Sequence, residues 1–361
     1  MTHSQPASVE LRGVDVVVNQ REILRHIDLN VLPGELFVVL GGAGSGKSTL
    51  LRSIAGLDPV AAGSLWIDDQ EITRSAANRR PIALMFQSYR LWPHMPVARN
   101  VGFALDRSGL GASDRRGRVT RELAFVGLSE FARHLPWQLN PSQRQRVALA
   151  RTLAADARVI LLDEPFSAQD AQRREHLLRV LRKRLQQSAA TTLLTTQDRS
   201  EALRVADRIA VVHEGEIQQT GTPIELYDTP RNRYVAEYMG SANLIDGEIE
   251  FAGEQALFRA ENGIVIPLFD HPLIRPRTGT AMFRPHDLHV VHPNAAPFGD
   301  QIRFSGRVEQ TEFLGDSMRY SIEIAGKTVW MDRSRSSETL LNVGDQVVVG
   351  LDPARIRILE G

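Results

Sequence analysis

The stretch from Val38 to Thr49, VVLGGAGSGKST, constrains the fold of this 361-residue chain more than any other segment. An apolar run leads directly into a glycine-rich turn that ends on Lys47 and Ser48. Glycines allow successive backbone N–H groups to converge on a phosphate, and the helix that follows adds positive potential. The pattern G-x-x-x-x-G-K-[ST] is complete from Gly41 onward, so we predict a strand, a phosphate-binding loop and a helix in that order.

Two side chains of this loop carry specific predicted roles. Lys47 is expected to reach the β- and γ-phosphates of a nucleotide, and the hydroxyl of Ser48 to ligate Mg²⁺. The alternative is that this glycine-rich turn has a purely structural role, and motifs elsewhere in the chain are needed to distinguish the two interpretations. The other predicted nucleotide contacts in the loop are Gly41, Gly42, Ala43, Gly44, Ser45, Gly46 and Thr49.

Charge and composition exclude several classes of function. Lys plus Arg number 43 and Asp plus Glu number 43, so no net field favours nucleic acid as a partner. The absence of cysteine excludes disulfides and thiolate metal sites. The first ten residues, MTHSQPASVE, show no signal-peptide pattern, and no run approaches the roughly 18 apolar residues of a membrane span. We therefore expect a cytosolic chain that does not itself cross a bilayer.

The first two thirds of the chain mix short apolar runs with helical patterns. Continuous apolar runs are typical of strands buried on both faces of a parallel sheet. A helix is predicted over Ala171–Gln187, whose leucines at helical spacing form a core-facing stripe. The predicted strands are Leu36–Leu40, Ile82–Phe86, Val159–Leu162, Thr192–Thr195 and Ile209–Val212.

After Gly240 the pattern changes to short apolar runs separated by Gly, Asp, Asn and Pro. Such spacing predicts a small β-barrel or sandwich. We place the domain boundary near Tyr238–Asn243, which gives domains of residues 1–238 and 239–361. The predicted strands of the second domain are Ile302–Val308, Met318–Ile324, Thr328–Met331, Val347–Leu351 and Ile356–Leu359.

Four further segments follow the phosphate loop, and in this order they resemble the ATP-binding subunit of an ATP-binding-cassette (ABC) transporter. They are MFQSYRLWPHM, LNPSQ, VILLDEPFSAQD and TTLLTTQDRSEAL. The resemblance implies that Gln87 contacts Mg²⁺ and the attacking water. Asp163 ends an apolar strand, where it can hold the magnesium shell. Glu164 comes next, and a carboxylate there is suited to orient and deprotonate water.

The resemblance covers essentially the whole chain and implies a fold class. It is an α/β P-loop NTPase (RecA-like) nucleotide-binding domain with a helical subdomain at about residues 88–151, followed by a small all-β, oligonucleotide-binding-like (TOBE) barrel. The tail is similar to that of importer ATPases for sugars, polyamines, sulfate and ferric iron. The implied cofactors are ATP and Mg²⁺. The implied partners are a second ATP-binding subunit, membrane-spanning permease subunits and an external solute-binding protein, with this chain peripheral on the cytoplasmic face of the inner membrane.

One departure from the family pattern lies at Leu139–Gln143, LNPSQ, where the family has LSGGQ, the loop that grips the γ-phosphate held by the partner subunit. Pro141 has no N–H to donate, and the Cβ of Ser142 disfavours a positive φ by about 1–2 kcal/mol. We expect a weakened grip through Asn140, Ser142 and Gln143. Asn140 is a good N-cap, Pro141 suits the first helical position and Gln143 completes a capping box, so the helix start is predicted to be preserved.

Three further departures concern single positions. Gln197 stands where the family has a switch histidine; it can donate a hydrogen bond but cannot carry charge. A loss of about 10²–10³ in turnover is expected if nothing compensates. Near Val18 an aliphatic residue replaces the aromatic that stacks on adenine, an interaction worth about 1–3 kcal/mol. Gln169 replaces a leucine of the D-loop, a change whose consequence the sequence does not reveal.

The preferred function is therefore the ATP-hydrolysing subunit of an importer, with Glu164, Lys47 and Gln197 as catalytic residues. The main alternative is a nucleotide-binding but catalytically degenerate, regulatory subunit, possible in a heterodimer. A soluble cassette protein of translation or DNA repair would carry two cassettes or long coiled-coil insertions, which this sequence lacks, and a P-loop kinase would not need the later segments. The sequence FRPHD at Phe283–Asp287 resembles that of ferric-iron, sulfate or polyamine importer subunits, but the sequence does not identify the transported solute.

Overall fold

The computed structural model describes residues 5–107, 109–155, 157–188, 190–252, 255–261, 263–268, 278–291, 301–335 and 340–359. Two compact units divide the chain, Met1–Pro223 and Ile224–Gly361. The boundary predicted at residues 238–243 lies inside the second unit and stays a prediction. None of the described helices combines the length and the hydropathy that crossing a bilayer requires.

A six-stranded sheet in the order β10-β9-β3-β8-β7-β6 forms the centre of the first unit. All neighbouring strands are parallel except the antiparallel pair β9 and β10. β3, β7 and β8 are buried at every position, as their continuous apolar runs predicted. All five predicted strands are confirmed. The bounds are β3 (Leu36–Leu40), β6 (Ile82–Met85), β7 (Val159–Asp163), β8 (Thr191–Thr196), β9 (Arg208–His213) and β10 (Glu216–Gly221).

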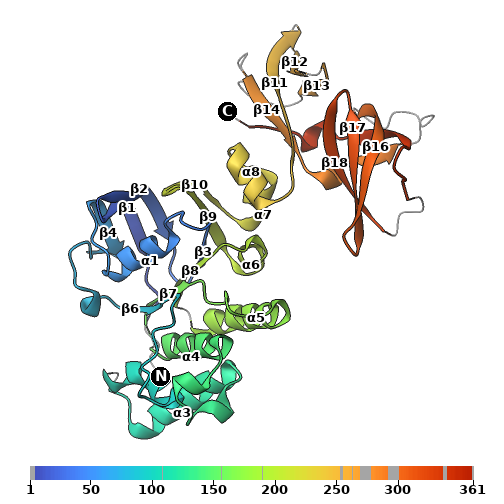
Figure 1. The fold of residues 1–361 in the computed structure, drawn as a ribbon. Coiled ribbons are helices and arrows are strands. Elements are labelled where there is room, and N and C mark those ends of the chain that lie inside the picture. Colours follow the sequence, from blue (N-terminus) through green and yellow to red (C-terminus); the bar gives the residue numbers. More distant parts are fainter. Residues whose placement is uncertain are drawn as a thin grey trace. The chain divides into compact units, whose positions relative to one another are not determined.

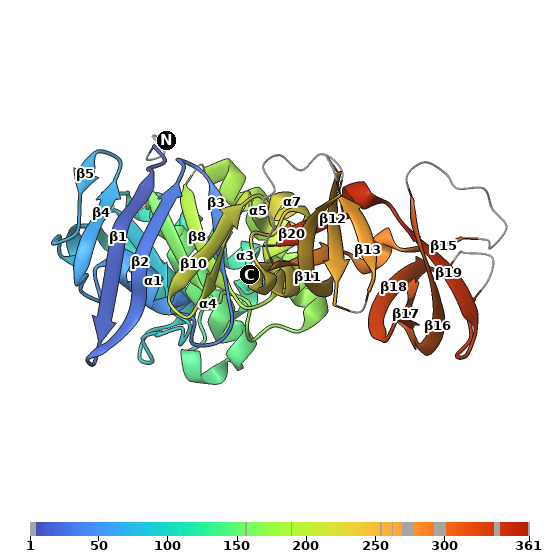
Figure 2. The same ribbon diagram turned by 90° about the horizontal axis from the view of Figure 1, so that it is seen from above.

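An antiparallel sheet in the order β2-β1-β4-β5 lies beside the first helix of this unit (Figure 2). The sequence analysis did not identify these strands. Their buried faces share one hydrophobic core with β3, β7 and helix α1 (Lys47–Ala55), so the helix after the glycine loop is packed between two sheets. The strands are β1 (Val9–Val18), β2 (Arg21–Val31), β4 (Ala62–Ile67) and β5 (Gln70–Glu71).

Helices complete the first unit, and α2, α3 and α4 pack on one another within the range predicted for the helical subdomain (Figure 1). The predicted leucine stripe on α5 is confirmed, because Leu177, Leu178, Leu181 and Leu185 are all buried. The helices are α2 (Val97–Gly102), α3 (Ala112–Phe125), α4 (Pro141–Ala154), α5 (Ala171–Ser188) and α6 (Arg199–Val205), with 3-10 turns at Ala77–Arg79, Phe103–Arg107, Ser129–Phe131 and Pro136–Gln138.

The second unit starts with two short helices and continues as two five-stranded antiparallel sheets that share one core. The predicted runs between residues 302 and 351 are confirmed as β16 to β19, and the last run forms β20, which pairs with β14 in the other sheet. The elements are α7 (Pro223–Asp228), α8 (Arg233–Met239), β11 (Asn243–Ala252), β12 (Gln255–Ala260), β13 (Val265–Leu268), β14 (Thr278–Phe283), β15 (His289–Val291), β16 (Ile302–Phe313), β17 (Ser317–Ile324), β18 (Lys327–Ser334), β19 (Gln346–Leu351) and β20 (Arg357–Leu359), with 3-10 turns at Pro285–Asp287 and Pro353–Arg355.

A buried arginine joins the two helices to the sheets of this unit. Arg284, 3 % exposed, follows β14 directly and its guanidinium donates to the backbone carbonyls of Tyr227, Ala236, Gly240 and Ser241. The same guanidinium lies 4.1 Å from the centroid of the Tyr227 ring. These contacts tie α7 and α8 to the β-strands and account for their place in the second unit.

Replacement of Arg284 by methionine is predicted to destabilise the second unit by about 2–3 kcal/mol, because buried carbonyl groups lose a charged donor. Calorimetric unfolding of the full chain should show this as a lower melting temperature for the transition of that unit. The matched control is Arg259→Met, since the ion pair of Arg259 with Glu250 is about half exposed on both sides and contributes little. Equal melting temperatures for the two variants would contradict the assignment.

Candidate active site

The predicted phosphate loop connects β3 to α1 through residues 41–46, and two of its glycines are required by the packing. Gly46 has a φ of 101° and a Cβ there would lie 2.6 Å from the side chain of Leu24. A Cβ on Gly41 would lie 2.4 Å from the carbonyl oxygen of Val212. No side chain fits at these two points, so both positions require glycine.

The side chain of Lys47 reaches back over the loop that precedes it in the sequence. Its Nζ donates to the carbonyl oxygens of Gly41 at 2.8 Å and Gly42 at 2.7 Å. Burial lowers the pKa of Lys47, while the nearby carboxylates of Glu164 and Asp163 act in the opposite direction. A buried ammonium over an anion-binding loop is well placed to pair with a phosphate.

A buried carboxylate, Asp163, lies at the carboxyl end of β7. Its Oδ1 accepts hydrogen bonds from Ser48 Oγ at 2.9 Å and from Thr195 Oγ1 at 2.8 Å. Burial raises the pKa of Asp163, and these two hydrogen bonds oppose the shift. The side chain is 6 % exposed, so its charge depends on these partners.

The oxygens around Asp163 suit a magnesium ion. Within the described ranges, no three His, Cys, Asp or Glu side chains gather to hold a metal by themselves. Mg²⁺ is usually held by one or two carboxylates together with phosphate oxygens of a substrate, and a serine hydroxyl next to a carboxylate matches that donor set. Ser48 and Asp163 fit such an ion only if a phosphate completes the site.

The structure brings the side chain of Glu164 between two carboxamides from distant segments. Gln87 Nε2 donates to one carboxylate oxygen at 2.9 Å, and Gln197 Nε2 donates to the other at 2.6 Å. Glu164 has a φ of 45°, and its backbone N–H donates to the Thr195 carbonyl at 3.2 Å. The glutamate is therefore held at both its backbone and its carboxylate.

The segment after Gln87 is held by the helices of the first unit. Arg151 of α4 donates to the carbonyl oxygens of Tyr89 at 2.8 Å and Arg90 at 2.9 Å, and its guanidinium lies 4.9 Å from the centroid of the Trp92 ring. The Asn100 side chain of α2, fully buried, accepts from the backbone N–H of Trp92 at 2.8 Å. The segment thus has a defined conformation supported by α2 and α4.

The predicted start of α4 at residues 140–143 is confirmed as a capping box. Asn140 Oδ1 accepts from the Gln143 N–H at 2.8 Å, and Gln143 Oε1 accepts from the Asn140 N–H at 2.9 Å. Pro141 is the first helical residue. Ser142 lies in the first turn of α4 and is not among the positive-φ residues, so its Cβ carries no conformational penalty here, and the weakened grip stays a prediction.

The remaining predicted contacts lie apart from this cluster or line the loop. Val18 ends β1, where it pairs with Arg21 and packs partly buried on the core. The hydroxyl of Thr49, in the first turn of α1, accepts from the Arg52 side chain at 3.2 Å. Within the loop itself, Ser45 is buried, whereas Ala43 and Gly44 are exposed.

Two functional side chains escaped the sequence analysis. Thr195 lies in a predicted strand and donates to Asp163. The signal that could have revealed this role is a hydroxyl near the carboxyl end of a strand that lies parallel to the one carrying Asp163. Gln145 is fully buried in α4, and its Nε2 donates to the carbonyl oxygen of Glu164 at 3.2 Å. A polar residue on the buried face of a helix was the only hint of that role.

Comparisons with known proteins support a nucleotide site. A family model described as "ABC transporter" matches residues 24–167, and one described as "TOBE domain" matches residues 281–359. An Fe(3+) ion import ATP-binding protein of Rhizobium meliloti (strain 1021) is 35 % identical over 336 residues, 92 % of each chain. A spermidine/putrescine import ATP-binding protein of Hahella chejuensis is 34 % identical over 331 residues, 90 % of each chain.

Solved structures agree with the fold of the first unit. A dimeric, post-hydrolysis structure of an ATP-binding cassette bound to ADP and Pi is similar with a TM-score of 0.55 and 30 % identity. The match covers 59 % of this chain and 98 % of that one. The similarity therefore extends over nearly the whole of that cassette and over part of this chain.

Replacement of Asp163 by asparagine is predicted to raise the melting temperature, and in a domain of this size each 1 kcal/mol gained corresponds to about 2–4 °C. The raised pKa means that the folded state disfavours the charged carboxylate. That penalty is absent in acid, where the folded and unfolded chains are both protonated, and it grows as pH rises through the raised pKa. Scanning calorimetry should thus show a larger gain for Asp163→Asn at neutral pH than in acid; a gain independent of pH would contradict the argument.

Proposed function

The chain belongs to the ABC transporter family, as an ATP-binding subunit with a C-terminal TOBE domain, and from that premise we propose that it binds Mg²⁺–ATP and hydrolyses it to drive import of a solute. The observation that carries this proposal is the convergence of Lys47, the Ser48–Asp163 pair and the clamped Glu164 at the carboxyl edge of one parallel sheet. A nucleotide bound to residues 41–49 would have its terminal phosphate next to all three.

Each residue has a defined part in the proposed reaction. Lys47 exchanges the carbonyl oxygens of Gly41 and Gly42 for phosphate oxygens when the nucleotide enters. Ser48 and Asp163 hold the magnesium ion, which when bound neutralises charge on the phosphates. Glu164 orients a water molecule and takes one of its protons as the water oxygen attacks the γ-phosphorus, and the bond to the β,γ-bridging oxygen breaks.

Gln87 and Gln197 keep the Glu164 carboxylate aimed at that water. Their amide N–H groups occupy one lone pair on each carboxylate oxygen, and the remaining lone pairs are left for the proton of the water. The contact from Gln197 supports a role for this residue despite the loss of the histidine. In this arrangement Gln197 compensates in part by positioning the base.

The proposed assembly contains a second ATP-binding subunit and permease subunits. A similar cassette forms a dimer with its nucleotide products, which supports dimer closure around ATP. The segment from Gln87 to Met95, fixed on α2 and α4, is the proposed contact with the permease. The subunit would lie on the cytoplasmic face of the inner membrane, peripheral to it, and an external solute-binding protein would deliver the solute.

A catalytically degenerate, regulatory subunit is the second candidate. It is favoured by the start of α4, where Pro141 has no N–H and where the backbone N–H groups of Asn140 and Gln143 each donate to the side-chain oxygen of the other residue. These two N–H groups would otherwise be available to donate to the γ-phosphate held by the partner subunit. Rapid phosphate release by a homodimer in a single-turnover experiment would reject this candidate, and slow release would favour it.

Replacement of Glu164 by glutamine is predicted to lower kcat for ATP hydrolysis by about 10²- to 10⁴-fold, because the amide cannot accept the proton. The assay is steady-state phosphate release by the full chain assembled with its permease. ATP binding, measured by equilibrium dialysis, should survive in Glu164→Gln and be lost in Lys47→Ala. Equal hydrolysis rates for wild type and Glu164→Gln would reject the base, and equal binding by Lys47→Ala would reject the nucleotide site.

A further inference from the structure

Gln169, in the loop between Glu164 and α5, is a buried amide whose consequence the sequence analysis left open. It is 4 % exposed. Its Nε2 donates to the carbonyl oxygen of Ser142 at 3.0 Å and to Gln145 Oε1 at 2.8 Å, and its Oε1 accepts from Ser142 Oγ at 2.7 Å. All three bonds join the loop to the first two turns of α4.

The bond to Gln145 determines which way that second amide faces. Gln145 Oε1 accepts from Gln169 Nε2 and from the Ala168 N–H at 3.2 Å, so its Nε2 is directed to the other side. There it donates to the Glu164 carbonyl at 3.2 Å and to Ser167 Oγ at 3.1 Å. An amide has one donor end and one acceptor end, so fixing one end fixes the other.

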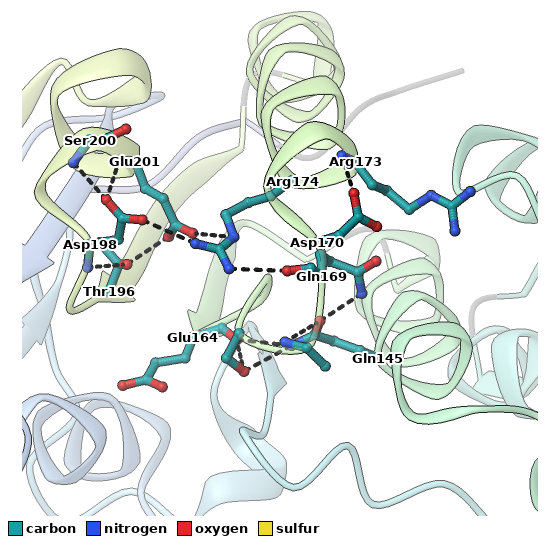
Figure 3. A network of polar contacts seen from close by, with 12 residues as sticks. Gln145, Glu164, Gln169, Asp170, Arg173, Arg174, Thr196, Asp198, Ser200 and Glu201 are labelled. Atoms are coloured by element: carbon teal, nitrogen blue, oxygen red, sulfur yellow. Dashed lines mark hydrogen bonds and ion pairs between the residues drawn. The ribbon is translucent and has the colours of Figure 1, made fainter. Parts of the chain in front are cut away.

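The backbone of Glu164 needs this support. Its φ of 45° lies in the left-handed region, which costs a residue with a Cβ roughly 1–2 kcal/mol. Such a conformation persists only where the surroundings over-determine it. Figure 3 shows the Glu164 carboxylate directed away from Gln145, while the backbone of the same residue faces the amide network.

The network extends from Gln169 to the segment that carries Gln197. Arg174 of α5 donates to the Gln169 carbonyl at 3.0 Å and to Asp198 Oδ2 at 3.1 Å, and its Nε lies 3.5 Å from Glu201 Oε1 (Figure 3). The loop is therefore connected both to the backbone of Glu164 and to the segment that carries Gln197.

We propose that Gln169 is a positioning residue for ATP hydrolysis: paired with Ser142, it orients Gln145 and thereby holds Glu164 in the conformation that aims its carboxylate. It does not touch the nucleotide. The inference rests on the proposed function, since it assigns a support to the proposed base. It also unites two departures from the family pattern, Ser142 and Gln169, in one hydrogen-bonded pair.

The primary variant is Gln169→Met, which keeps the length of the side chain and removes its hydrogen bonds. ATPase activity of the full chain is predicted to fall in kcat by about 10- to 100-fold with little change in KM, because a misplaced base slows the chemical step without weakening nucleotide binding. Gln186→Met is the matched control, since Gln186 is exposed on α5. Its kcat should equal that of the wild type.

A double-mutant cycle with Ser142→Ala tests the pairing itself. The two residues act through one contact, so the kcat of Ser142→Ala/Gln169→Met should be no lower than that of Gln169→Met alone. Multiplicative losses in the double variant would overturn the pairing. If Gln169→Met does not fold, Ser142→Ala, which removes only the hydroxyl, is measured alone and must still lower kcat at unchanged KM.

The controls separate this inference from the proposed function. A wild-type chain that hydrolyses ATP, with Glu164→Gln inactive and Gln169→Met as active as wild type, overturns the role of Gln169 and leaves the proposed function intact. If the wild-type chain does not hydrolyse ATP, the proposed function itself is rejected, and the inference that rests on it is rejected with it. A structural role would appear in Gln169→Met as a loss in kcat accompanied by a lower melting temperature and a KM raised to the same extent, with none of these changes in Gln186→Met. That result would also overturn the inference.

Discussion

The burial of one carboxylate at the edge of a parallel sheet is the constraint on which the site depends. Asp163 is charged only at a cost, because burial raises its pKa, and hydroxyls from two other segments offset part of that cost. Ser48 lies in the first turn of α1, and Thr195 lies near the carboxyl end of β8, the strand between β3 and β7. Satisfying this one group therefore brings the phosphate loop and the end of β8 next to the proposed base, Glu164.

Helix α4 is the common support of the groups around that edge. Near its start, Ser142 and Gln145 bind the loop that leads from Glu164 to α5. Near its end, Arg151 binds the backbone that follows Gln87. A displacement of this helix would act on both the proposed base and the proposed permease contact. In the proposed assembly, α4 would thus couple transport and hydrolysis as the helix that contacts both segments.

The sequence allowed the parallel sheet and the order of the site segments to be predicted, because buried parallel strands are continuous apolar runs. It did not reveal the antiparallel sheet that begins with β1, whose strands alternate and carry many polar residues. Nor could it assign Ile356–Leu359 to its partner, since an alternating pattern reports which face is buried and not which strand lies alongside. The amide clamp on Glu164 depends on side-chain directions of segments 33 and 77 residues away, and no local pattern encodes these.

The departures from the family pattern acquire a different meaning once they are placed in the fold. Taken one at a time, a hydroxyl at Ser142 and an amide at Gln169 each look like erosion of a motif. In the fold they satisfy each other, and the buried amide of Gln169 would be costly without a partner in reach. Gln197 follows the same logic: its amide and that of Gln87 both donate to Glu164, and neither titrates. The clamp therefore keeps the same charge across physiological pH, which a histidine in that position would not do.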